Sequence, residues 1–161
     1  SVSAFLLNRS SDLEMIFPYL CSEIQKHIEM CMYATRKDPF VAKTDITCYK
    51  VISKNILGIY RTPVQGTWIR RNQIKGKKPM IASGRHDGLT IIEGGFIHGF
   101  DNLITCEMWF RYARKRLERG LWKLEIHECS IPAGTEYYTD GVGSIAAKQM
   151  IIGKMVKSKY D

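Results

Sequence analysis

A thiol and an imidazole stand two residues apart, at Cys129 and His127. Residues two apart on a β-strand share a face, so these two side chains are expected to lie together. A thiol beside an imidazole can lose its proton and act as a nucleophile. No nucleophile elbow or other flanking signature accompanies the pair. A buried strand cysteine beside a half-exposed histidine is therefore the favoured interpretation.

The remaining cysteines and histidines predict no metal site. The chain has five cysteines and four histidines, with no CxxC spacing and no histidine pair at helical spacing. The odd number and wide spacing of the cysteines are typical of reduced thiols that pack as small hydrophobic residues. This pattern predicts a reducing compartment and a cytoplasmic location, with no metal and no cofactor.

A second group of chemically capable residues is cationic and aromatic, and it falls between positions 61 and 78. Its members are Arg61, Trp68, Arg70, Arg71, Lys75, Lys77 and Lys78. Lysine and arginine neutralise phosphates, and aromatic rings stack on bases. Gly76 and Pro79 predict that the basic run from Arg70 to Lys78 is a loop without regular structure.

The charge of the whole chain is +8, which favours anionic partners. A nucleotide, a nucleic acid or an acidic protein would each fit this charge, and solubility alone is the alternative explanation. We therefore expect a binding protein that engages an anionic partner through the basic loop.

A glycine-rich segment, residues 94–99, precedes the next predicted helix. It matches neither Gly-rich nucleotide fingerprint, and a turn with positive φ is its simplest interpretation. Its amides could face an anion near the helix N-terminus, although the carboxylate of Asp101 would oppose such binding.

The elements that must position these residues begin with an N-terminal helix. Residues 11–14, Ser-Asp-Leu-Glu, form a capping-box pattern. Apolar residues then recur at helical spacing as far as Met32 and Tyr33, with Pro18 expected to break or kink the helix. Because this helix has one apolar face, it is expected to pack on the rest of the chain or to mediate homo-oligomers. No apolar run is long enough to span a bilayer, so no membrane partner is expected.

From Thr47 the apolar pattern changes to short β-rich runs. A hairpin is predicted with its turn at residues 53–55. Further strands are predicted at 68–69, 89–93, 121–131, 136–139 and 149–152, and residues 154–161 are expected to fray.

A second helix is predicted over residues 103–119, capped by Asp101 or Asn102 and ended by Gly120. Its buried side is expected to comprise Ile104, Met108, Leu117 and either Tyr112 or Phe110. The predicted fold class is α+β, in one domain over residues 1–161. An N-terminal helix, residues 1–34, packs on a mostly antiparallel β unit, residues 47–156, which contains one further long helix.

The order of elements over residues 47–156 is similar to that of ADP-ribosyltransferase-like domains. The likeness rests on the strand at Tyr49-Lys50, the Gly-Phe segment 95–100, the helix after it, the run 131–138 and the final apolar strand. The segment 95–100 also resembles small phage-borne domains with a Gly-Phe-x-x-Phe segment.

The resemblance implies a dinucleotide pocket for NAD, with catalytic candidates at Lys50, His98 and Gln149. Gln149 stands where the transferases carry a catalytic Glu, and a neutral amide cannot stabilise positive charge as a carboxylate does. Two alternatives stay open. One is a phage-encoded accessory or anti-defence binding protein, and the other is a transferase acting on NAD with degenerate catalytic residues.

Overall fold

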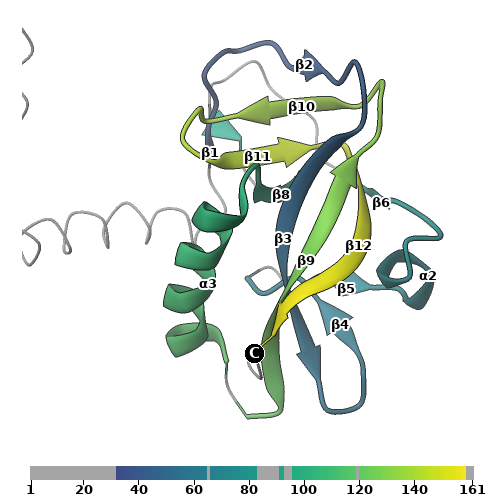
Figure 1. The fold of residues 1–161 in the computed structure, drawn as a ribbon, viewed down its shortest axis with the longest axis vertical. Helices are drawn as coiled ribbons and strands as arrows, with labels where there is room; N and C mark the ends of the chain where they lie inside the picture. Colours follow the sequence, from purple (N-terminus) through teal and green to yellow (C-terminus); the bar gives the residue numbers. More distant parts are fainter. Residues whose placement is uncertain (1–31, 65, 83–90, 93–95, 119, 159–161) are drawn as a thin grey trace, which may run out of the picture.

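The computed structural model of the chain describes residues 32–64, 66–82, 91–92, 96–118 and 120–158. Antiparallel β-strands are its main regular structure, and one long helix packs beside them (Figure 1). The strands are β1 (Met32–Tyr33), β2 (Phe40–Val41), β3 (Ile46–Asn55), β4 (Tyr60–Arg61), β5 (Trp68–Ile69), β6 (Met80–Ile81), β7 (Ile91–Ile92), β8 (Ile97–Phe100), β9 (Trp122–Ile131), β10 (Glu136–Thr139), β11 (Ser144–Ala147) and β12 (Gln149–Ser158). The helices in the described ranges are α2 (Arg71–Ile74) and α3 (Leu103–Leu117).

Ten of the described strands form one sheet. Its order is β2-β10-β11-β8-β3-β9-β12-β6; outside this path, β4 pairs with β3 and β5 pairs with β4. β3 and β9 pair along their full length, from Ile46 opposite Ile131 to Asn55 opposite Trp122. β12 pairs with the other edge of β9, and β1 and β7 form a separate two-stranded ribbon.

Side chains alternate along β3, so its two faces contribute to two hydrophobic clusters. Cys48 and Ile52 join a cluster built from the other strands, which includes the fully buried Met150. Val51 joins a second cluster with Phe110 and other residues of α3. The helix therefore covers one face of the central strands, as Figure 1 shows.

The predicted α+β class is wrong, because the described chain is mostly antiparallel β-sheet. The expected N-terminal helix lies outside the described residues, except at its last two positions. Met32 and Tyr33 form β1 and pair with β7. Met32 is 1% exposed and packs with Phe96 and Tyr138. It is therefore buried as part of a strand and not as part of a helix.

The turn of the first hairpin lies later than predicted. Residues 53–55 continue β3, and the chain reverses at residues 56–59. The side-chain Oδ1 of Asn55 accepts hydrogen bonds from the amides of Leu57 and Ile59, at 3.0 and 2.9 Å. Gly58 supplies the positive φ of 73° that the turn requires. The hydrogen bonds to the Asn55 side chain thus hold residues 56–59 in a turn, although their apolar side chains favour a strand.

The second helix is confirmed as α3, and Asn102 caps it by accepting a hydrogen bond from the Thr105 amide at 2.8 Å. The predicted buried side is confirmed at Phe110, and Leu117 packs against the same cluster, but it is wrong at Ile104 and Met108, which are exposed. The buried residues are Cys106, Trp109, Phe110 and Ala113. Their spacing is also helical, and it places the two large aromatic rings against the sheet.

Three short segments also differ from expectation. Lys154–Ser158 does not fray but continues β12, and Lys157 lies opposite Ile126 of β9. The basic segment contains the helical turn α2, where the Arg70 amide donates to Gln73 Oε1 at 2.9 Å. Residues 97–100 of the glycine-rich segment form strand β8 rather than a turn. Gly99 is needed there because a Cβ would lie 2.8 Å from the carbonyl oxygen of Tyr49.

No helix in the described ranges is long and apolar enough to cross a membrane.

Candidate functional site

The cationic and aromatic residues that the sequence singled out lie on β4, β5 and α2 and on the residues that flank α2. Arg61 and Trp68 are paired across β4 and β5. Figure 1 shows where these three elements lie. We call this set the cationic surface, and it comprises Arg61, Trp68, Arg70, Arg71, Lys75, Lys77 and Lys78. All of its cations except Arg61 are exposed. Among the described residues, none of its cations forms an ion pair with a carboxylate. No carboxylate of the described chain therefore offsets the charge of these cations.

An aromatic pair lies beside these cations. Trp68 is 63% exposed, and its ring centre lies 6.1 Å from that of Trp122 on β9. The guanidinium of Arg61 stands 3.7 Å from the centre of the Trp122 ring, a cation–π contact that holds this arginine in place. Trp122 was missed as a site residue, because only the pairing of β9 with β3 brings it here. Trp68 thus presents an open ring next to positive charge.

A hollow of about 830 Å³ adjoins the cationic surface. Arg71 of α2 and Lys75, which caps that helix, line it together with apolar residues of the first hairpin and with His127. Two of the predicted binding residues therefore contribute charge to a concave surface, where an anion can contact more than one side chain.

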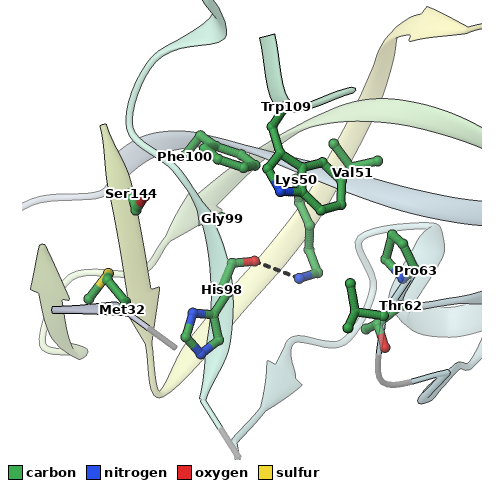
Figure 2. Close-up of a pocket in the computed structure, with 11 residues that line it drawn as sticks. Met32, Lys50, Val51, Thr62, Pro63, His98, Gly99, Phe100, Trp109 and Ser144 are labelled. Carbon is green, nitrogen blue, oxygen red and sulfur yellow. Dashed lines mark hydrogen bonds between the residues drawn. The ribbon is translucent and has the colours of Figure 1, made fainter. Parts of the chain in front are cut away.

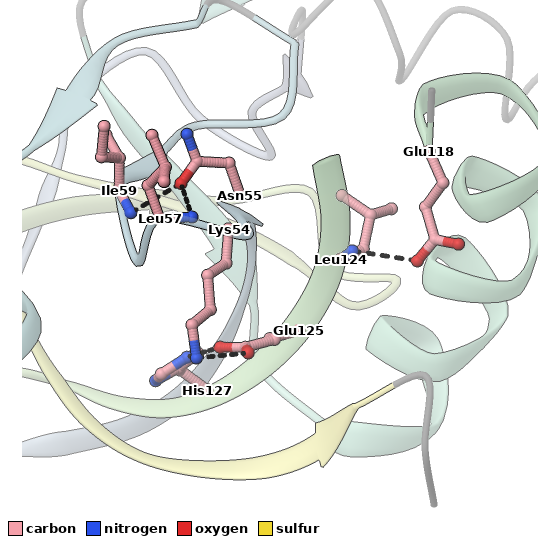
Figure 3. Close-up of polar contacts among 8 residues, drawn as sticks. All are labelled: Lys54, Asn55, Leu57, Ile59, Glu118, Leu124, Glu125 and His127. Carbon is pink, nitrogen blue, oxygen red and sulfur yellow. Dashed lines mark hydrogen bonds and ion pairs between the residues drawn. The ribbon is translucent and has the colours of Figure 1, made fainter. Parts of the chain in front are cut away.

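The buried residues His127 and Glu125 form a polar cluster with the partly exposed Lys54 (Figure 3). Its Nε2 lies 3.1 Å from Glu125 Oε2, and its Nδ1 lies 3.3 Å from the carbonyl oxygen of Gly153. Both neighbours are hydrogen-bond acceptors, so a ring nitrogen that carries a proton can donate it to the neighbour it faces. With both nitrogens engaged, His127 is a structural residue in the wall of the hollow.

The carboxyl of Glu125 is held in its charged form. Burial raises its pKa, but the hydrogen bond from His127 and the charge of Lys54 outweigh that effect. The net pKa of Glu125 therefore lies below its ordinary value. Lys54 Nζ is 3.4 Å from Glu125 Oε1.

The Cys129 thiol does not contact the His127 ring in a way that would activate it. Its Sγ donates to the backbone carbonyl of His127 at 3.6 Å. Burial raises the pKa of Cys129 to about 11, and it raises those of Cys48 and Cys106 further. All three are free and buried, so the structure favours the buried-cysteine interpretation. The expected half-exposure of the neighbouring histidine is wrong, because His127 is 5% exposed. Cys21 and Cys31 lie outside the described residues.

Lys50 is the most deeply buried cation of the described chain, at 4% exposure. Its Nζ donates to the backbone carbonyl oxygen of His98 at 2.6 Å, at the wall of a small cavity of about 50 Å³ (Figure 2). Burial lowers the pKa of Lys50, an effect that neighbouring cysteine thiols oppose only in part. The structure thus brings together two of the three residues that the transferase resemblance suggested.

The third, Gln149, is exposed at the start of β12, lies opposite Ile81 of β6, and is not among the residues that line the Lys50 cavity. A comparison of the chain with family models, with curated proteins and with solved structures gave no match. The resemblance to ADP-ribosyltransferase-like domains stays a prediction.

Proposed function

We propose that this chain is a binding protein that engages single-stranded nucleic acid through the cationic surface. The observation that carries the proposal is the exposed ring of Trp68 among five exposed cations that have no carboxylate partner in the described chain. Proteins that bind single strands combine cations along the phosphate backbone with rings on which bases stack.

The other basic face of the molecule is less suited to this role. On α3, Arg111 lies 4.0 Å from Glu107 and Arg114 lies 3.6 Å from Glu118, so carboxylates offset part of its charge. Figure 1 shows α2 and α3 on opposite sides of the sheet. The two basic faces can therefore be tested independently.

The aromatic contribution favours nucleic acid over an acidic protein. Free carboxylates need only cations, whereas bases also need an exposed flat ring, and Trp68 offers one. The hollow lined by Arg71 and Lys75 gives a phosphate two cations at once. A free nucleotide would satisfy part of this surface, while a strand would span its length.

The direct test is a binding titration with a fluorescein-labelled oligothymidylate, followed by anisotropy at low salt. A Lys75→Glu, Lys77→Glu, Lys78→Glu triple variant should abolish binding, because it reverses charge on the cationic surface. A Lys37→Glu, Lys43→Glu, Lys115→Glu triple variant makes the same net-charge change at exposed positions elsewhere and should retain most of the affinity.

Unlabelled competitors distinguish the classes of partner. A single strand should displace the probe far better than a nucleoside triphosphate or a poly-glutamate peptide does. If the first triple variant binds as tightly as the parent, or if poly-glutamate competes as well as the strand, the proposal fails.

A further inference from the structure

The Lys50 cavity belongs to a different part of the molecule from the cationic surface. Its wall includes Val51, Trp109, Phe100 and the segment Thr62–Val64 (Figure 2). None of its described lining residues is acidic, and none belongs to the cationic surface. A buried lysine is ordinarily paired with a carboxylate, whereas in the described chain the Lys50 amine donates to a backbone carbonyl oxygen, that of His98, at 2.6 Å.

The pairing of the strands explains why the cavity exists. β9 occupies one edge of β3 along its whole length, so β8 and β4 share the other edge. β8 pairs with that edge at Tyr49, and β4 joins it at Ser53 and Lys54. Between Tyr49 and Ser53, no described strand pairs with this edge of β3, so Lys50 has no strand neighbour on this side. The cavity lies at this interruption and opens to solvent.

We propose that the Lys50 amine is a nucleophile that captures a small carbonyl compound as a Schiff base in this cavity. The space of about 50 Å³ admits a few heavy atoms, which restricts the ligand to a short-chain aldehyde or α-oxo acid.

The chemistry requires a neutral amine with an available lone pair. Burial lowers the pKa of Lys50, which favours this form, as at other lysines that act through a Schiff base. One N–H donates to the carbonyl oxygen of His98 and fixes the position of the nitrogen. The lone pair attacks the carbonyl carbon and forms a C–N bond. The carbonyl oxygen of the ligand takes up the two protons that the nitrogen loses and leaves as water, which gives the imine. Addition of water to the imine reverses the reaction.

The test traps the imine in the intact chain. The parent protein is incubated at pH 7 with acetaldehyde, or separately with glyoxylate, and sodium cyanoborohydride reduces any imine to a stable secondary amine. Peptide mapping by mass spectrometry then gives the rate of modification at each lysine. The exposed residues Lys37 and Lys43 serve as internal controls.

Lys50 is expected to be modified at least about tenfold faster than the control lysines, because an exposed lysine amine is mostly protonated at neutral pH. A Lys50→Arg variant with an unchanged circular dichroism spectrum should lose this fast phase and keep the slow modification of the others. The proposal is overturned if Lys50 stays unmodified while the control lysines react, or if it reacts only in denaturant. Mapping of the parent decides the question even if the variant does not fold. Because the readout is covalent modification, its failure leaves the nucleic-acid proposal untouched.

Discussion

Neutralising three lysines of the cationic surface should flatten the salt dependence of strand binding by a calculable amount. Five exposed cations lie on this surface: Arg70, Arg71, Lys75, Lys77 and Lys78. For single strands, the slope of log K against log salt is about −0.7 per neutralised phosphate. If each cation contacts one phosphate, the parent slope is about −3.5, so affinity falls about 100-fold between 50 and 200 mM salt. A Lys75→Gln, Lys77→Gln, Lys78→Gln variant keeps two cations, and its slope should be about −1.4.

The assay is the anisotropy titration with labelled oligothymidylate, repeated at several salt concentrations. A Lys37→Gln, Lys43→Gln, Lys115→Gln variant has the same net charge as the first and should keep the parent slope. A parent slope flatter than about −1, or equal slopes for the two variants, would refute the reasoning.

Four further predictions concern Trp68, Glu125, Gly99 and the transferase alternative. Trp68→Ala should weaken strand binding by about 1–3 kcal/mol through lost stacking, and Trp68→Phe should recover part of it, both measured by the same titration. Glu125→Gln should lower the free energy of unfolding by about 1–3 kcal/mol at pH 7, measured by urea denaturation. Because the folded-state pKa of Glu125 lies below its unfolded value, the charged form stabilises the fold above a pH of roughly 4.3; the difference between parent and variant should therefore shrink as the pH falls through the folded pKa. Gly99→Ala should cost about 1–3 kcal/mol of stability, because its Cβ would press against the Tyr49 carbonyl and separate β8 from β3. Under the transferase alternative, labelled NAD should be consumed or its label transferred to protein, and a lack of both across many targets would count against that alternative.

Local signals predicted several elements well. The strands at 122–131 and 136–139 and the helix at 103–117 lie where alternation, turn residues and the Asn102 cap indicated. The errors arose where tertiary contacts decide between local alternatives. The face of α3 that is buried depends on the aromatic pair Trp109 and Phe110 meeting the sheet, and periodicity alone allows either stripe. The length of β12 depends on β9 as its partner, which no local pattern reveals.

Some features of the candidate sites could be predicted from the sequence, and others depend on the pairing of distant strands. The cationic surface was readable because its members lie close together in the sequence, and the fold keeps them on β4, β5 and α2. The position of Trp122 and the Lys54–Glu125 contact required the register of β9 against β3. The environment of Lys50 was also not readable, because it results from two different strands sharing one edge of β3.

The measurement that tests the binding proposal most directly is a nuclear magnetic resonance titration of the labelled full chain with an oligothymidylate. The account predicts that the largest amide shift changes lie in β5 and α2, together with a change at the Trp68 indole N–H. Changes concentrated instead on the exposed face of α3, at Arg111 and Lys115, would contradict it, because the strand would then bind the opposite side of the sheet (Figure 1).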